Sequence, residues 1–266
     1  TLHALARDLR EAFAGRAVSV TSSQGRFADG AALLDGRKVL DASAWGKHLF
    51  VEFEGDAWLH VHLGLIGVFS FEPPGSAPRG AVRVRLATRK HVADLRGPNL
   101  CAVVTPEQVA GVHARLGPDP LRPGADPDQA WRRISRSART VAELLMDQAV
   151  LAGVGNVYRS ELLYRHRVDP FRPGKEIRPR TWSAMWEDLV HLMPLAMAAG
   201  QILTMAYQVD DAVVELDTTG TVTRPERRYY VYKRTGEPCR VCRSKVRTQV
   251  VAGRNLFWCG RCQRRR

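Results

Sequence analysis

Four of the five cysteines in this 266-residue chain lie close together near its end, and their spacing constrains the fold more than any other feature. They form two Cys-x2-Cys pairs separated by 16 residues: Cys239, Cys242, Cys259 and Cys262. Two such pairs are typical of a hairpin that holds one Zn²⁺ ion, since each pair turns two thiolates toward the metal. Redox dithiols are the alternative, but no βαβ pattern surrounds the cysteines. Because four thiolates leave no open coordination position, we expect one structural zinc ion.

The charge of the chain indicates an anionic partner. Lys and Arg number 40 against 27 Asp and Glu, which gives a formal net charge of +13. Arg predominates and suits bidentate phosphate contacts, so a polyanion is the expected partner. A GC-rich genome would explain the preference for Arg over Lys equally well, but not the net charge. No stretch reaches the ~18 apolar residues of a membrane span, and no signal-peptide layout is present, so we expect a soluble cytosolic protein.

The chain divides into three zones of an α+β protein. Residues 1–121 begin with an amphipathic helix and continue as short β-like runs between Gly and Pro, which predicts a β-sandwich with a flanking helix. Residues 122–128 have the composition of a linker. Residues 129–222 are predicted to be helical, and residues 223–266 hold the Cys hairpin. The predicted β runs are 17–20, 57–62, 67–71, 81–87 and 91–94, with a further β-rich segment at 229–232.

A glycine-rich turn lies within the helical zone. Helices are predicted to begin at Thr140, Asn156 and Thr181. Gly153 and Gly155 allow a tight turn before Asn156, where exposed amides and the helix dipole favour an anion. Such turns often only connect elements. Arg159 follows on the same helix and the Cys hairpin is rich in Arg, so we expect a phosphate-binding surface that includes Arg159.

Three segments together resemble a known family. They are LLMDQAVLAGVGNVYRSELLYRHRVDP (144–170), GEPCRVC…GRNLFWCGRCQ (236–263) and GKHLF (46–50). Over essentially its whole length the chain resembles the formamidopyrimidine-DNA glycosylase and endonuclease VIII family, and most of all the endonuclease VIII-like proteins of actinobacteria. The resemblance implies an N-terminal β-sandwich, a helix-two-turn-helix domain and a zinc finger. It also implies base-excision repair: removal of oxidised bases, with pyrimidines expected, and cleavage of the abasic strand by β,δ-elimination.

The resemblance assigns roles to four individual residues. Lys47 matches the lysine that the family uses in β-elimination, and Arg254 matches the arginine that reaches the target phosphate and assists δ-elimination. Asn156 matches the asparagine that grips a phosphate, and Arg115 matches a DNA-contacting arginine at the end of the first domain. Without the motifs, Lys47 would be interpreted as a solvated lysine at a strand edge, and Arg254 as one more cation on a basic finger.

The segment HLGLIG (62–67) resembles the family loop that inserts side chains where the flipped nucleotide was stacked. Some relatives carry Gln or Met there, whereas this chain has Gly64, Leu65 and Ile66. An apolar wedge in the vacated stack is physically reasonable. The alternative is that Leu65 and Ile66 are ordinary core residues of an apolar strand.

The beginning of the chain departs from the family pattern. The family begins Pro-Glu-Gly-x, and the proline amine attacks the sugar to form a Schiff base, with the Glu as its acid/base partner. This chain opens at Thr1, which aligns with the residue after those four. An amine four residues later on a helix is displaced by roughly 6 Å, too far for attack. We therefore expect the catalytic Pro and Glu to lie upstream of Thr1.

Three functional hypotheses follow. The first is a bifunctional DNA glycosylase and abasic-site lyase, acting as a monomer on damaged or abasic double-stranded DNA in the bacterial cytoplasm and nucleoid. The second is a zinc-dependent reader of damaged DNA without chemistry. The third is a zinc-ribbon factor of transcription or translation.

Overall fold

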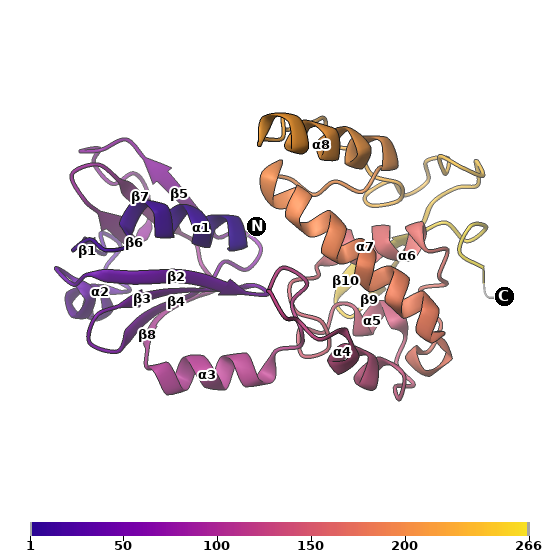
Figure 1. Ribbon diagram of the computed structural model, residues 1–266, viewed down its shortest axis with the longest axis horizontal. Helices are drawn as coiled ribbons and strands as arrows, with labels where there is room; N and C mark the ends of the chain where they lie inside the picture. The colour runs from indigo at the N-terminus through magenta and orange to yellow at the C-terminus, as the bar shows by residue number, and fades with distance from the viewer. Residues whose placement is uncertain (1, 265–266) are drawn as a thin grey trace. The chain divides into compact units, whose positions relative to one another are not determined.

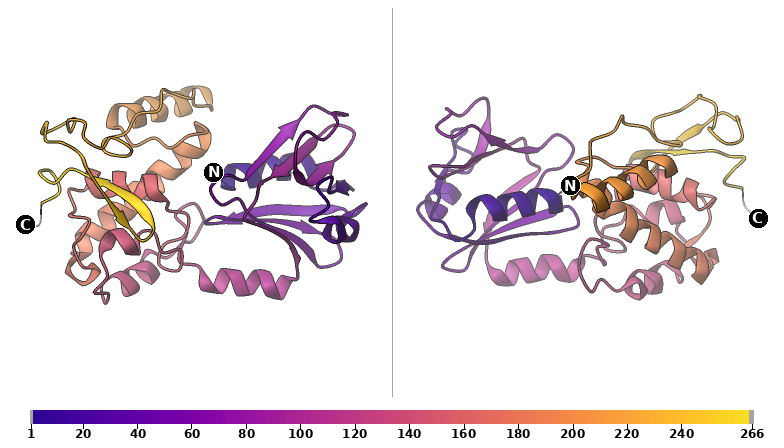
Figure 2. Two further views of the ribbon diagram at one scale, coloured as in Figure 1. Left: turned by 180° about the vertical axis from the view of Figure 1, so that it is seen from behind. Right: turned by 45° about the horizontal axis from the view of Figure 1, so that its top comes forward.

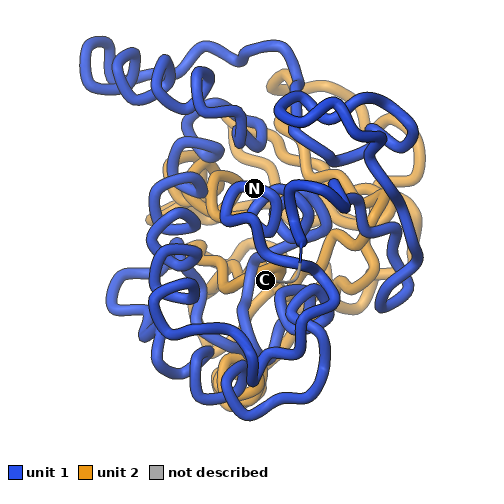
Figure 3. The backbone as a smooth tube through the Cα atoms, turned by 90° about the vertical axis from the view of Figure 1, so that its right-hand side faces the viewer, with its two compact units in different colours: residues 1, 116–266 blue, residues 2–115 orange. Residues whose placement is uncertain are grey.

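The computed structural model describes residues 2–264; Thr1, at which the family comparison starts, lies outside the described residues, as do Arg265 and Arg266. The chain divides into two compact units between Arg115 and Leu116, which we call the N-terminal unit and the C-terminal unit (Figure 3). This division falls a few residues before the predicted boundary at 121. Each unit is described by itself.

The N-terminal unit contains two antiparallel sheets, as the sandwich prediction requires (Figure 1). Their strand orders are β2–β3–β4–β8 and β1–β6–β7–β5. The strands are β1 (Ser19–Thr21), β2 (Val39–Trp45), β3 (His48–Phe53), β4 (Ala57–His62), β5 (Val68–Glu72), β6 (Val82–Ala87), β7 (Val92–Arg96) and β8 (Leu100–Val104). The helices are α1 (Leu2–Phe13), α2 (Ala28–Leu34) and α3 (Pro106–Arg115).

The first sheet is buried on both faces over part of its width. One face joins the core between the sheets, to which α1 adds Leu9 and Phe13. The other face is covered in part by α3, whose His113 packs on Phe50 (Figure 1). Leu49, Phe50 and Val51 are therefore buried in succession. Strand β3 accordingly lacks a regular alternation; it was not predicted, and neither were β2 and β8.

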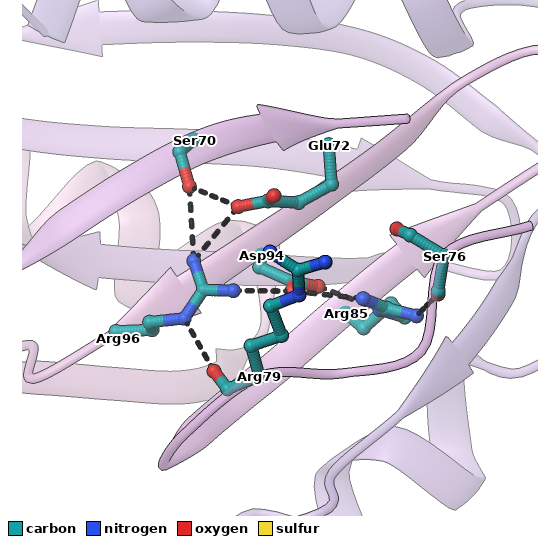
Figure 4. A network of polar contacts seen from close by, with 7 residues as sticks. All are labelled: Ser70, Glu72, Ser76, Arg79, Arg85, Asp94 and Arg96. Atoms are coloured by element: carbon teal, nitrogen blue, oxygen red, sulfur yellow. Dashed lines mark hydrogen bonds and ion pairs between the residues drawn. The ribbon is translucent and has the colours of Figure 1, made fainter. Parts of the chain in front are cut away.

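A buried carboxylate organises the outer face of the second sheet (Figure 4). Asp94 on β7 is fully buried and accepts two hydrogen bonds from Arg85 on β6, at 2.7 and 2.9 Å. Arg96 donates to the same carboxylate at 2.7 Å and to Glu72 on β5 at 3.0 Å. Arg85 also binds the carbonyl of Ser76 in the loop that follows β5. This network joins three strands and a loop through charges that have little access to water.

The C-terminal unit packs helices against one β-hairpin (Figure 2). Its hydrophobic core is built mainly by α6 and α7 with the turns around them, and the hairpin adds Leu256. Strand β10 lies beside α6. The elements are α4 (Pro127–Ile134), α5 (Val141–Leu144), α6 (Asn156–Arg165), the 3₁₀ helix η1 (Gly174–Glu176), α7 (Pro179–Ala198), α8 (Ala206–Thr219), β9 (Arg247–Val251) and β10 (Arg254–Trp258).

Several details of the helical zone differ from the prediction. Residues 122–128 end in the cap and first residues of α4, because Asp126 accepts the amide of Asp128 and Pro127 opens the helix. Asn156 is the first residue of α6 rather than its cap, which is Gly155. The segment 229–232 forms no strand, since its amides are bound by a buried carboxylate described below.

Along residues 2–264, no helix combines the length and apolar character that crossing a membrane requires.

Replacing Asp94 by Asn should destabilise the protein. The neutral amide leaves the guanidinium groups of Arg85 and Arg96 without their shared carboxylate, which costs about 3 kcal/mol in the free energy of unfolding. Urea denaturation at pH 7 measures the change. Asp41→Asn is the matched control, because the Arg10–Asp41 pair is about half exposed on both sides and should contribute less than about 1 kcal/mol. Equal effects of the two substitutions would contradict the role given to Asp94.

Candidate nucleic-acid interface and metal centre

Lys47 is held by a tight turn between β2 and β3. Trp45 and His48 pair across this turn, which leaves only Gly46 and Lys47 in the loop. Gly46 has φ +59° and comes first in the loop, as in a type II′ hairpin turn, where glycine takes the left-handed position. The turn therefore presents the half-buried Lys47 at the end of the sheet.

Four imidazoles lie behind Lys47, on the face of the first sheet that α3 covers. His48 on β3 and His60 on β4 are joined by a hydrogen bond of 2.8 Å between Nδ1 and Nε2. The ring of His62 lies 5.1 Å from that of His48. His113 of α3 packs against Phe50 on the same face. We call His48, His60, His62 and His113 the imidazole cluster.

Three members of the imidazole cluster, His48, His60 and His62, are neutral at pH 7 because burial lowers their pKa values. Burial lowers the pKa of His48 to about 4, and the neighbouring His62, His113, Arg115 and Lys47 act in the same direction. Burial also lowers the pKa of His60 to about 4. The positive charge of this region therefore comes from Lys47 and Arg115. Both residues belong to the N-terminal unit and lie near His48.

The loop after β4 carries the predicted wedge. Leu65 and Ile66 are 79% and 83% exposed, the highest values among the exposed large hydrophobic residues of the described chain. They are therefore not core residues, and the alternative given above is wrong. Gly64 has φ +69°, and a Cβ there would lie 2.9 Å from Cβ of Asn99, so the loop needs glycine at this position. Its amide donates to Nδ1 of His62, which links the loop to the imidazole cluster.

Asn156 and Arg159 connect the start of α6 to the Cys hairpin. The amide nitrogen of Asn156 donates to the carbonyl of Asn255 on β10 at 2.9 Å, while its oxygen accepts from Arg159. Arg159 donates further to the carbonyls of Val251 and Arg254. The first-turn amides of α6 have no side-chain cap and remain available to an anion.

The expected direct contact of Arg159 with DNA does not fit its environment. The side chain is fully buried, and burial together with Arg254 lowers its pKa to about 10. Its hydrogen bonds are directed at Asn156 and at the hairpin. Arg159 is thus a positioning residue, whereas Arg115 and Arg254 are exposed as predicted for residues that reach a ligand.

Arg254 stands directly after the tip of the β9–β10 hairpin. Val251 pairs with Arg254, and the two residues between them, Ala252 and Gly253, have φ of +51° and +70°. Two successive positive values are typical of a type I′ turn, whose twist matches that of the strands. The exposed side chain of Arg254 and the start of α6 therefore lie at the same end of the α6–β10 pair.

The four predicted cysteines converge on one point. All four Sγ atoms lie within 4.8 Å of one another, and the distances are 3.8 Å for Cys239–Cys262 and 3.3 Å for Cys242–Cys259. In a ZnS₄ tetrahedron with bonds of about 2.3 Å the sulfurs are about 3.8 Å apart. None of the four is in a disulfide. The donor set therefore fits Zn²⁺. Four thiolate ligands leave the ion no open coordination position for catalysis.

Glu161 was not predicted, although the hairpin depends on it. The carboxylate is fully buried and accepts the amides of Tyr230, Val231 and Tyr232 at 2.8 to 2.9 Å. Thr204 donates to it at 2.7 Å. In the sequence, Glu161 looks like an ordinary polar residue of a predicted helix. Its burial could have been predicted only if it had stood on a fully apolar face of that helix.

Family models cover most of the chain. The formamidopyrimidine-DNA glycosylase N-terminal domain matches residues 1–99, and the H2TH domain of the same enzyme matches residues 116–207. A zinc finger found in FPG and IleRS matches residues 236–265. The four cysteines are accordingly the ligands of a structural zinc ion.

Individual proteins match over nearly the full length. Endonuclease 8 1 of Mycobacterium bovis is 49% identical, over 99% of this chain and 98% of that protein. The formamidopyrimidine-DNA glycosylase of Thermus thermophilus is 32% identical, over 87% of this chain and 85% of its own length. Among solved structures, Lactococcus lactis Fpg in a complex with abasic-site DNA has a TM-score of 0.81 and 20% identity, covering 99% of this chain and 98% of its own.

The metal content of cysteine variants tests the zinc site. Cys259→Ser should reduce bound zinc from one ion per chain to well below that value, because three thiolates bind the ion more weakly than four and the hairpin loses its closure. Atomic absorption of the purified protein gives the ratio. Cys101→Ala is the control, since Cys101 lies on β8 of the other unit and should leave the zinc content unchanged. Full zinc content in Cys259→Ser would refute the assignment.

The imidazole cluster predicts a loss of stability in mild acid. Unfolded histidines bind protons near pH 6.5, whereas folded His48 and His60 stay neutral down to about pH 4. Their contribution is therefore complete above pH 6.5 and decreases as the pH falls toward 4. The free energy of unfolding, measured with urea, should differ less between pH 7 and pH 5 in His60→Asn than in the wild type. This difference should be unchanged in His191→Gln, an exposed position; an unchanged difference in His60→Asn would contradict the prediction.

Proposed function

Since this chain belongs to the formamidopyrimidine-DNA glycosylase and endonuclease VIII family, we propose that it is a base-excision repair DNA glycosylase with abasic-site lyase activity. We propose further that it acts as a monomer on damaged double-stranded DNA in a bacterial cell. The observation that carries this proposal is the pairing of Asn156 with the Cys hairpin: the uncapped start of α6 and the exposed Arg254 lie at one end of the same structure. That arrangement suits the phosphates of one strand.

Binding begins with the backbone of the duplex. The first-turn amides of α6 and the guanidinium group of Arg254 offer donors to successive phosphates. In the N-terminal unit, Lys47 and Arg115 supply charge in a region where His48, His60 and His62 are neutral. Such contacts are independent of base sequence, and the affinity should fall steeply with salt.

Extrusion of the damaged nucleotide leaves a gap that Leu65 and Ile66 can fill. Both side chains are exposed and apolar, and they stand on a loop fixed by Gly64 and by its bond to His62. Inserting them between base pairs compensates for part of the lost stacking. Extrusion costs least for a base that is already weakly paired or stacked, which favours damaged nucleotides.

The chemistry assigned to this chain is the elimination at the abasic sugar. In the family resemblance, the amine that forms the Schiff base belongs to an N-terminal proline that is followed by a glutamate. The positive charge of the resulting iminium makes the C2′ proton acidic, so that the 3′ phosphate can leave. We assign Lys47 to this β-elimination and Arg254 to the departure of the second phosphate. The turn at Gly46 and the imidazole cluster fix the position of Lys47.

Borohydride trapping tests the proposal. With Pro-Glu-Gly-x placed before Thr1, the protein and a duplex with an oxidised pyrimidine should give a covalent adduct, because reduction fixes the imine. Residues 1–266 alone should bind without an adduct. Lys47→Gln in the extended protein should bind the duplex normally but cleave abasic DNA about 10²-fold or more slowly, in the range for loss of one acid–base group. If the extended protein gave no adduct, the enzymatic proposal would be wrong, and the protein would be a reader of damaged DNA that catalyses no reaction.

Asn156→Ala separates the binding part of the proposal from its chemistry. Loss of this side chain frees the hairpin from the start of α6, so the affinity for duplex should fall and log K should depend less steeply on log salt. Fluorescence anisotropy between about 50 and 200 mM salt measures both. His191→Gln serves as the matched neutral control. An unchanged salt dependence in Asn156→Ala would contradict the proposal that Asn156 and the start of α6 hold a phosphate.

A further inference from the structure

An arginine-lined pocket lies in the C-terminal unit, away from the proposed DNA-binding residues Asn156 and Arg254. Its volume is about 500 Å³ and it is open to solvent. Six of its eleven lining residues are arginines, and none is acidic: Arg167, Arg172, Arg178, Arg180, Arg261 and Arg264. They come from the end of α6, the start of α7 and the segment around the last zinc ligand, so segments far apart in the sequence contribute to it.

The pocket and the proposed DNA-binding residues lie at opposite ends of one structure. At the first end of the α6–β10 pair, Asn156 binds the backbone of Asn255. At the other end, Gln263 donates to the carbonyl of Val168 just beyond α6. The ten residues of α6 separate the two ends by about 15 Å. A phosphate held by Asn156 therefore cannot also occupy the pocket.

Four of the six arginines of the pocket have no acidic partner among the ion pairs of the described residues: Arg178, Arg180, Arg261 and Arg264. The exposed residues Arg178 and Arg180 stand at the start of the 20-residue helix α7, which has no acidic residue in its first turn and no side-chain cap. Cations at this end of a helix are unfavourable because they meet the positive end of its dipole. A bound anion would reverse that interaction.

The basic surface continues beyond the pocket. A second depression of about 330 Å³ shares Arg261 and Arg264 with it and adds Lys245 and Arg247 on the Cys hairpin. The combined surface is wider than one phosphate needs. Its planar guanidinium groups favour bidentate contacts with phosphate oxygens.

We propose that this pocket is a second binding site, which takes a chain of linked phosphates. The phosphates belong either to a nucleic-acid segment other than the one held by Asn156 and Arg254, or to a free polyphosphate. Only the first source rests on the proposed function. A second nucleic-acid site would let the protein hold one duplex while it contacts another segment of the same or a neighbouring molecule.

The test uses the zinc-loaded chain and the double variant Arg178→Gln/Arg180→Gln. Isothermal titration with sodium tripolyphosphate should show binding by the wild type and a loss of affinity of about tenfold or more in the variant. The matched control is Arg89→Gln/Lys90→Gln, which removes two exposed neighbouring charges from the N-terminal unit and should bind as the wild type does. The melting temperature of the pocket variant should be unchanged or higher, because two cations leave the start of a helix.

A second arm identifies the source of the phosphates. The protein is first saturated with an unlabelled duplex that contains an abasic analogue, and a labelled undamaged duplex is then added. If nucleic acid is the source, the labelled duplex joins the wild-type complex but not that of the pocket variant. If tripolyphosphate alone binds through the two arginines, the source is free polyphosphate.

Equal affinity of wild type and pocket variant for both probes would overturn the proposal, as would loss of binding accompanied by a lower melting temperature. Failure of the wild type to bind the abasic duplex would instead count against the proposed function, and the tripolyphosphate titration would still decide the pocket.

Discussion

The C-terminal unit depends on polar groups buried between α6 and the Cys hairpin. Glu161 binds three successive amides ahead of the first cysteine pair, and Arg159 binds two carbonyls at the far end of the hairpin. Each of these groups would be costly to bury without its partners. The hairpin therefore has one favourable position on the helix. That position places Arg254 beside the start of α6 and the zinc ligands beside its end.

In the N-terminal unit, burial of histidines limits the positive charge around Lys47. Four histidines could carry up to four positive charges, and they would repel the lysine and Arg115. Burial lowers the pKa of His48, His60 and His62 and keeps these three neutral instead. The neighbouring rings also help to hold the turn that carries Lys47 in place.

The amount that the sequence could predict depended on how local each signal was. The zinc ligands follow from the spacing of the cysteines, and they were predicted. Strands β2, β3 and β8 were missed; in β3, burial on two faces removes the alternation. Arg159 was expected at the surface, since nothing in its neighbours in sequence shows that hairpin carbonyls 92 and 95 residues away will surround it. Glu161 was missed for the same reason. The burial and the contacts of both residues depend on partners that are distant in the sequence.

The two aliphatic side chains on the loop after β4 have a thermodynamic consequence. Leu65 and Ile66 are in contact with water in the free protein, and each buried CH₂ group is worth about 0.8 kcal/mol. Without nucleic acid the exposure of this surface is unfavourable. Inserted between base pairs, the same surface is removed from water. Association with a damaged duplex should then carry a negative change in heat capacity, which separates insertion from contact with phosphates alone.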